Sequence, residues 1–189
     1  MNALDDGLDF ETRVNPYGYD ANDRVAIFLD VRNITSKLGT NTKADFAKIR
    51  KDVLNGRKCV AAYAVDGVQY DERGKDVDRD FHRELRRAGF RVDLVKASNN
   101  KGKQEGVDMR LGLLALDLVK DKVCNVVELI TGDGDFHVLV SMLQYRGAVV
   151  NVSSFHRSLS YLLGDTADNV RILDNFAAVK MEPRIREVA

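Results

Sequence analysis

The sequence contains only two cysteines, two prolines and no tryptophan, and it has no excess of charge of either sign. Two isolated cysteines, Cys59 and Cys124, are too few for a disulfide framework or a zinc site, so we interpret both as small core residues. Lys plus Arg and Asp plus Glu each number 29, so overall charge cannot drive binding to nucleic acid or to a membrane. Any nucleic-acid contact must come from a local patch.

Long apolar runs are also missing. None approaches the roughly 20 residues that span a bilayer, and residues 1–6, MNALDD, lack the basic and then apolar pattern of a secretory signal. Hydrophobic residues still make up 44% of the chain, which argues against disorder, and 189 residues fit a single domain. We therefore expect a cytoplasmic, soluble protein with no membrane partner. No feature of the sequence predicts an oligomeric state.

The N-terminal residues differ in composition from the rest. Residues 1–23 carry six acidic side chains against a single basic one, Arg13, and show no apolar periodicity. We interpret them as a flexible acidic arm that is a candidate contact for a protein partner, and we expect residues 1–20 to be removable without loss of the fold. A folded domain is expected over residues 24–176 and a C-terminal tail over 177–189.

Between these ends, apolar runs alternate with amphipathic stretches. Val107, Leu111, Leu114 and Leu118 form one helical stripe, and Val77, Phe81 and Leu85 form another. The strands are short apolar runs, as expected when helices cover both faces of a parallel sheet. Gly67 suggests a turn or a small hairpin extension before the second helix. The pattern predicts an α/β fold, a three-layer α/β/α sandwich with a mostly parallel sheet, with strands at 25–29, 59–65, 90–95, 125–131 and 148–153 and helices at 42–54, 76–88, 107–120 and 135–145.

Acidic residues recur where these strands end. Asp30 ends the first strand, with Asn33 close behind, Asp133 and Asp135 follow the fourth, and Asp108 opens the third helix. Open parallel sheets bind ligands beyond the carboxyl ends of their strands. We expect all four aspartates at that edge.

Two explanations compete for these aspartates. Each one alone fits a helix cap, because Asp is favoured there. Capping does not require Asp133 and Asp135 together, nor Asp30 on a neighbouring strand. Converging carboxylates repel one another unless a cation neutralises them, and Mg²⁺ or Mn²⁺ prefers carboxylate oxygen. The constellation favours a divalent-metal site.

Three segments also resemble a known family. Residues 25–33, VAIFLDVRN, 106–109, GVDM, and 130–136, ITGDGDF, are similar to the signature segments of NYN domains, relatives of PIN-type nucleases, and 162–168, LLGDTAD, resembles their closing helix. The resemblance covers about residues 24–174. It implies a PIN-like fold and a Mg²⁺- or Mn²⁺-dependent ribonuclease whose catalytic residues and metal ligands are Asp30, Asp108, Asp133 and Asp135, with Asn33 in support. Glu105 departs from the family, many members of which have lysine there.

Other polar residues near this edge are candidates for binding the substrate. Lys101, Lys103 and Arg110 surround Asp108 and have the charge to contact phosphates, and Ser153 follows the fifth strand. An ordinary solvated loop explains the same lysines equally well. His82 and His137 lie on predicted helices and are interpreted as structural or exposed.

The leading hypothesis is therefore a metal-dependent phosphodiesterase that cleaves RNA. The first alternative is a non-catalytic RNA-binding or regulatory module of the same family. The second is a haloacid-dehalogenase-type phosphatase, because such enzymes share the Gly-Asp-Gly-Asp pattern. Against it, Arg32 stands where those enzymes place a second aspartate.

Overall fold

The computed structural model describes residues 20, 22–38, 42–96 and 106–174, together with the backbone of 178–180. Its elements are, in chain order, β1 (Arg24–Asp30), α1 (Val31–Ser36), β2 (Thr42–Ala44), α2 (Phe46–Leu54), β3 (Lys58–Val68), α3 (Arg79–Arg87), β4 (Arg91–Lys96), α4 (Val107–Lys120), β5 (Val126–Ile130), the 3₁₀ turn η1 (Gly134–Phe136), α5 (His137–Tyr145), β6 (Val149–Ser154), η2 (His156–Ser158), α6 (Tyr161–Thr166), β7 (Asn169–Ile172) and β8 (Ala178–Lys180).

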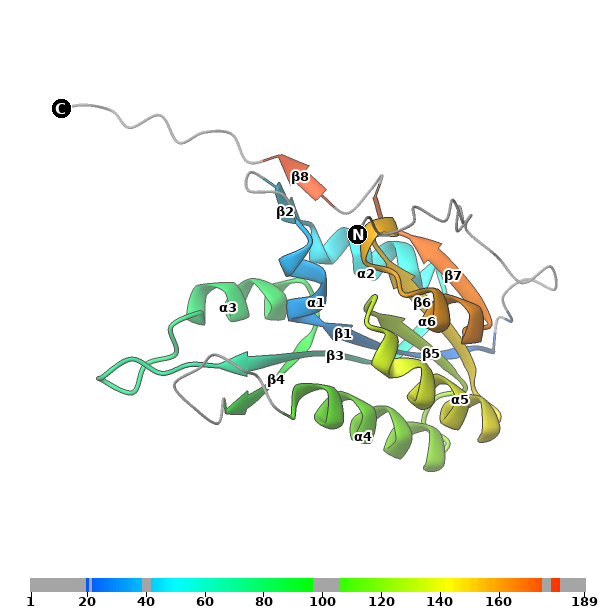
Figure 1. Cartoon of the computed structure of the whole chain (residues 1–189). Coiled ribbons are helices and arrows are strands. Elements are labelled where there is room, and N and C mark those ends of the chain that lie inside the picture. Colours follow the sequence, from blue (N-terminus) through cyan, green and yellow to red (C-terminus); the bar gives the residue numbers. More distant parts are fainter. Residues whose placement is uncertain (1–19, 21, 39–41, 97–105, 175–177, 181–189) are drawn as a thin grey trace, which may run out of the picture.

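Six of the strands form one parallel sheet in the order β4-β3-β1-β5-β6-β7, and β2 pairs with β8 in a separate antiparallel pair. Helices lie on both faces of the large sheet (Figure 1). The predicted α/β sandwich with a parallel sheet is therefore confirmed. Because the strands are parallel, their carboxyl ends all meet at the same edge.

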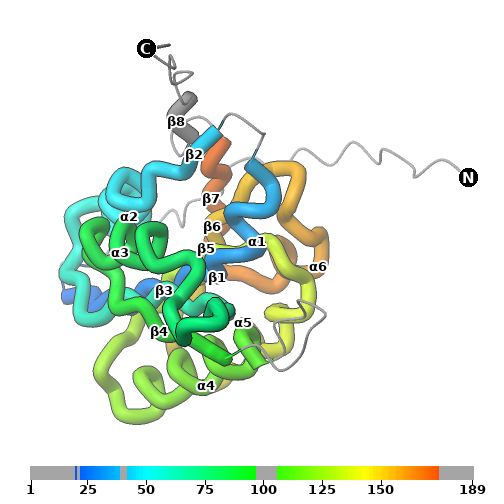
Figure 2. Tube along the Cα trace, turned by 90° about the vertical axis from the view of Figure 1, so that its left-hand side faces the viewer, coloured from blue at the N-terminus to red at the C-terminus, as the bar shows by residue number. Residues whose placement is uncertain are grey.

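The central strand β1 is buried on both of its faces, since residues 25–29 have no exposed surface. On one face, α1, α2 and α3 pack around Ile27 and Leu29, while on the other α4, α5 and α6 pack around Phe28. Seen along the sheet, the two helical layers lie on opposite sides of the strands (Figure 2). None of the helices in the described ranges has the length and hydropathy that crossing a membrane requires.

The first predicted helix, 42–54, is wrong at its start. Residues 42–44 form β2, and the helix begins only after Asp45, whose side chain accepts a hydrogen bond from the Lys48 backbone N–H. Capping by Asp45 and pairing of β2 with β8 explain the difference. The short helix α1, which directly follows Asp30, was not predicted.

The region between β3 and α3 differs from the prediction in where the chain turns. Gly67 is not in a turn, because β3 continues through it to Val68, which is buried. The chain reverses further on, where Tyr70 and Asp76 form an isolated antiparallel bridge. Val77 is 61% exposed and precedes α3, so only Phe81 and Leu85 of the predicted stripe pack against the core.

At the other end of the sheet, the sixth strand, β7, was missed. It has only four residues, and the polar Asn169 and Arg171 alternate with apolar ones, which left no apolar run to recognise. The closing helix predicted at 162–168 corresponds to α6.

The two cysteines are free thiols, and both pack in the core regions. Cys124 is buried, whereas Cys59 is partly buried. These positions agree with their interpretation as small core residues.

The predicted boundary of the folded domain can be located at its N-terminal end. Asp23 is 9% exposed and its carboxylate accepts a hydrogen bond from the Asn125 amide at 3.3 Å, so it packs with the sheet. The remainder of the predicted arm, apart from residues 20 and 22, lies outside the described residues. In the predicted tail, 178–180 form β8.

Candidate functional site

A pocket of about 310 Å³ opens at the carboxyl edge of the sheet. The carboxylates of Asp30, Asp108 and Asp133 share it with one cationic side chain, that of Arg32. Asp30 comes from the end of β1, Asp133 from the loop after β5, and Asp108 from the first turn of α4. The neighbouring strands β1 and β5 thus bring together Asp30 and Asp133, which are more than 100 positions apart in the sequence. The full lining is Asp30, Arg32, Asn33, Ser36, Val107, Asp108 and Asp133.

Asp30 is the most deeply placed of these carboxylates, with 4% of its surface exposed. Its Oδ1 accepts a hydrogen bond from the Asn33 backbone N–H at 3.2 Å, and its Oδ2 accepts one from the Thr131 hydroxyl at 2.9 Å. Burial, helped by the charges of Asp108 and Asp133, raises the pKa of Asp30 to about 6 against the lowering effect of these two hydrogen bonds. The two hydrogen bonds therefore hold the carboxyl group in one orientation, and its ionisation in the folded state costs free energy.

The loop after β5 is held in place by its own polar groups. The Thr131 hydroxyl accepts a hydrogen bond from the Asp133 backbone N–H at 3.2 Å, and the Asp133 carboxylate accepts one from the Asp135 N–H at 3.0 Å. The Asn33 amide oxygen accepts a hydrogen bond from the Gly132 N–H at 2.8 Å. The Asn33 side chain therefore connects α1 to this loop. The hydrogen bond between Thr131 and Asp30 makes a second connection, from the loop to the end of β1.

Asp108 and Asp135 differ from the other two aspartates. Both are exposed, and Asp135 does not line the pocket. Partial burial raises the pKa of Asp108, and the charges of Asp133 and Asp135 contribute to the rise, so both of these carboxylates lie within electrostatic reach of Asp108. Asp108 makes no cap hydrogen bond in α4.

These contacts allow the capping explanation to be compared with the cluster explanation. Asp30 and Asp133 do cap α1 and η1 with their side chains, as that explanation requires. Capping alone gives no reason for three carboxylates around one pocket, where the charges of Asp108 and Asp133 raise the pKa of Asp30. The arrangement is unfavourable in the absence of a compensating cation.

The donor set suits a hard divalent cation in its chemistry, since carboxylate and hydroxyl oxygens are the ligands that Mg²⁺ and Mn²⁺ prefer. Across the described residues, however, no group of three or more His, Cys, Asp or Glu side chains lies close enough to hold a metal ion. The side chains are gathered at the pocket without converging on one point. The pocket residues therefore match a divalent cation in the chemistry and the location of their oxygens, but not in ligand geometry.

The residues predicted to bind substrate have different locations. Asn33 lines the pocket. Arg110 pairs instead with Asp93 on β4, at 2.9 Å. Ser153 has no exposed surface and therefore does not reach a substrate in this structure. Lys101 and Lys103 lie outside the described residues.

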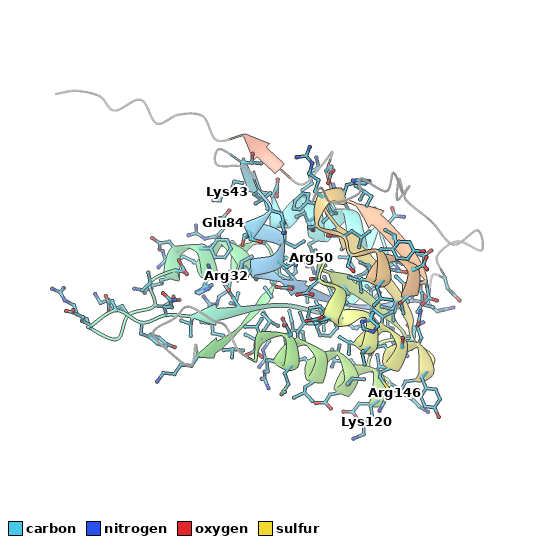
Figure 3. All side chains as sticks on the ribbon, in the orientation of Figure 1. Arg32, Lys43, Arg50, Glu84, Lys120 and Arg146 are labelled. Carbon is cyan, nitrogen blue, oxygen red and sulfur yellow. The ribbon has the colours of Figure 1, made fainter. Side chains whose placement is uncertain are left out.

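One part of the site was not among the predicted residues. Arg32 lies on α1 (Figure 3). Its guanidinium forms ion pairs with Asp66 on β3 and with Asp78 before α3. Burial alone lowers the pKa of Arg32, but hydrogen bonds and charges from Asp66 and Asp78 outweigh it and raise the pKa. The signal in the sequence was weak, because Asp66 lies 34 positions away from Arg32.

The close packing of the loop after β5 requires a glycine at position 132. This requirement gives a first prediction. A Cβ atom there would lie 2.1 Å from the Ser158 carbonyl oxygen, which is backbone and has little room to move. We expect Gly132→Ala to lower the free energy of unfolding by about 1 to 3 kcal/mol, as measured by urea denaturation. Gly147→Ala is a useful comparison, because nothing lies within 4 Å of its Cβ position and its cost arises from its φ of +83° alone. Equal stability of Gly132→Ala and the native protein would contradict this packing.

The raised pKa of Asp30 gives a second prediction, on stability against pH. A carboxyl group whose folded pKa is about 6 rather than 3.8 binds its proton more tightly in the folded state, so ionisation of Asp30 destabilises the fold as pH rises through 6. In chelator at pH 8, we expect Asp30→Asn to stabilise the protein by on the order of 1 kcal/mol, because water in the open pocket reduces the roughly 3 kcal/mol that the shift implies.

The gain from Asp30→Asn should shrink as pH falls toward 4, because it is lost fully only below the unfolded pKa of 3.8, where both states bind the proton. Thermal scans of the two proteins between pH 4 and pH 8 measure it. A gain that is the same at both ends of this range would show that charge on Asp30 is not its cause.

The chain matches the NYN domain model over residues 24–174. It therefore belongs to the NYN domain family, a family of PIN-like nucleases that act on RNA. No curated protein matches the chain. Among solved structures, it is similar to a protein of unknown function from Vibrio parahaemolyticus, with 29% sequence identity and a TM-score of 0.72 over 86% of this chain and 99% of that one.

Proposed function

We propose that this protein is a divalent-metal-dependent ribonuclease whose site is the acidic pocket at the carboxyl edge of the sheet. The observation that carries the proposal is the placement of Asp30, Asp108 and Asp133 around one pocket in a chain of the NYN family. Two of these carboxyl groups have raised pKa values, which means that the pocket gains free energy when a cation neutralises it. Family membership favours a nuclease over the phosphatase alternative.

Asp30, Asp108 and Asp133 would hold Mg²⁺ or Mn²⁺, with Asp135 adding negative charge from the rim. Such an ion, when bound, provides an activated water and stabilises charge on the phosphate. The protein contributes orientation. Thr131 and the Asn33 backbone N–H fix both oxygens of Asp30, and the Asn33 side chain fixes the loop that carries Asp133.

A non-catalytic RNA-binding module remains the second candidate, and one observation favours it. The acidic side chains of the described residues do not converge closely enough to ligate an ion as they stand. A binding module needs the same pocket shape but not that convergence. The two candidates therefore differ in whether RNA is cleaved when metal is added.

The deciding experiment incubates labelled single-stranded RNA with the protein in Mn²⁺, in Mg²⁺ and in chelator. A metal-dependent ribonuclease cleaves the RNA only when metal is present, and the Asp108→Asn variant should lose this cleavage. Asp108 is suitable for this test because it is exposed and makes no cap hydrogen bond, so its replacement should leave the fold intact. A binding module binds the RNA but does not cleave it under any of these conditions. Cleavage that persists undiminished in chelator would contradict the metal-dependent proposal.

A further inference from the structure

Arg32 has an unusual position for a basic residue in an acidic site. It lies two residues beyond Asp30, on α1, and lines the same pocket as the three aspartates. Its side chain is 45% exposed. RNA phosphates approaching a pocket lined by carboxylates are repelled, and Arg32 is the positive charge that this lining presents to them.

Two carboxylates hold the Arg32 side chain. Its Nε donates to Asp66 Oδ1 at 2.8 Å, and its Nη2 donates to Asp78 Oδ2 at 2.9 Å. Its Nη1 makes no hydrogen bond with any residue that the structure describes. An arginine has five N–H donors in a rigid plane, so donors remain for a phosphate after both ion pairs are made.

The first of these carboxylates is itself held from behind. Asp66 has no exposed surface, and its second oxygen lies 3.1 Å from Nε2 of His82, which is also fully buried. The other ring nitrogen of His82 lies 2.6 Å from Asp76, and Asp76 accepts a hydrogen bond from the Asp78 backbone N–H at 2.9 Å. The contacts run from Arg32 through Asp66, His82 and Asp76 to the backbone of Asp78 and fix both partners of Arg32.

Neutralisation of the buried Asp66 is the simpler explanation for Arg32. It accounts for the bond to Asp66 but not for the second bond to Asp78, which is 40% exposed and well solvated. It also gives no reason for nearly half of the Arg32 side chain to remain exposed in the pocket. A side chain already ordered by two ion pairs loses little further entropy when it binds a ligand.

We propose that Arg32 contacts the RNA phosphate at this site and that Asp66, Asp78 and His82 position it. The inference builds on the proposed function, whose site it shares, and adds a residue that binds the substrate. Because charge-assisted bonds between arginine and phosphate are strong and directional, the contact sets where the backbone lies relative to the aspartates.

The first test measures RNA affinity without turnover, by fluorescence anisotropy of labelled single-stranded RNA in chelator. We expect Arg32→Ala to raise Kd about tenfold or more, from the loss of a charged hydrogen bond, and Arg32→Lys to restore part of the affinity. Arg83→Ala is the matched control, because Arg83 is 48% exposed, pairs with Asp80 and lies outside the pocket. Equal Kd values for Arg32→Ala and Arg83→Ala would overturn the proposal.

The second test concerns positioning, and it uses Asp78→Asn. Asp78 is partly exposed and makes no side-chain cap in α3, so this variant should fold, whereas a change at the buried Asp66 could unfold the protein. Asp78→Asn should raise Kd by about threefold in the native background and have no effect in the Arg32→Ala background. The same effect in both backgrounds, or tighter binding, would overturn the positioning role.

Cleavage kinetics separate this proposal from the proposed function. In Mn²⁺, Arg32→Ala should raise KM much more than it lowers kcat, because the contact is made to the bound substrate as well as to the transition state. Loss of fold would lower the active fraction and leave KM unchanged. If the native protein binds RNA through Arg32 but does not cleave it, the ribonuclease proposal fails and this one stands. If the native protein cleaves RNA and Arg32→Ala binds it normally, the reverse holds, and a native protein that does neither overturns both.

Discussion

Asp133→Asn is expected to reduce RNA cleavage at least about 100-fold while leaving the fold intact. Asn retains the size of Asp and loses the charge that a divalent ion requires. Its side-chain oxygen can still accept the hydrogen bond from the Asp135 N–H, which Asp133 accepts at 3.0 Å, and Asn caps helices about as well as Asp. The loop after β5 should therefore keep its conformation.

The measurement for Asp133→Asn pairs initial cleavage rates in Mn²⁺ with melting temperatures in chelator. Asp117→Asn is the control, since Asp117 is exposed on α4 and lies outside the pocket. An undiminished cleavage rate would remove Asp133 from the site. A lost rate accompanied by a large fall in melting temperature would instead mean that Asp133 acts through the fold.

The sequence predicts the sheet well because its strands are buried on both faces. Residues 25–29 and 126–130 have almost no exposed surface. The first is an uninterrupted apolar run and the second is broken only by Glu128, so both can be recognised without a partner. β7 could not be recognised in this way. Its Asn169 amide donates to Asn151 on β6 and thus forms part of a buried polar network.

That polar network explains a second limit of the sequence pattern. Glu128 lies in the middle of β5, fully buried, and forms an ion pair with Arg57 and a hydrogen bond with Asn151 at 2.7 Å. Its burial raises its pKa, against the lowering effects of Arg57 and Asn151. A glutamate inside a strand cannot be assigned to the core or the surface until its partners, 71 and 23 positions away, are known.

For the site, the sequence predicts which carboxylates reach the edge but not how their oxygens are used. Asp30, Asp108 and Asp133 line one pocket because each ends a strand or opens a helix at the same edge of a parallel sheet. The role of Asn33 in fixing Gly132 depends on a contact across 99 positions. The connection from Arg32 through Asp66 to the buried His82 also depends on contacts between positions that are distant in the sequence. The apolar periodicity predicts only that His82 lies on a helix.

Divalent metal is expected to raise the melting temperature of the native protein by on the order of 5 to 10 °C. A cation that binds the folded pocket but not the unfolded chain stabilises by about 2.7 kcal/mol at a hundredfold excess over its dissociation constant, and a domain of this size gains about 2 to 4 °C per kcal/mol. Burial, and after it the charges of neighbouring aspartates, raises the pKa values of Asp30 and Asp108, so a bound cation offsets the cost of their negative charge. Helix caps alone predict no such response.

The variant that tests this origin is Asp30→Asn, Asp108→Asn. It removes two of the three pocket carboxylates, so the Mn²⁺-dependent rise should largely vanish, while the protein in chelator should be at least as stable as the native one because like charges are gone. Asp117→Asn, on the same helix as Asp108, should keep the full response. Thermal scans over several Mn²⁺ concentrations measure all three proteins. A flat response of the native protein across them would show that the three carboxylates do not bind the ion, and RNA recognition by this pocket would then have to proceed without it.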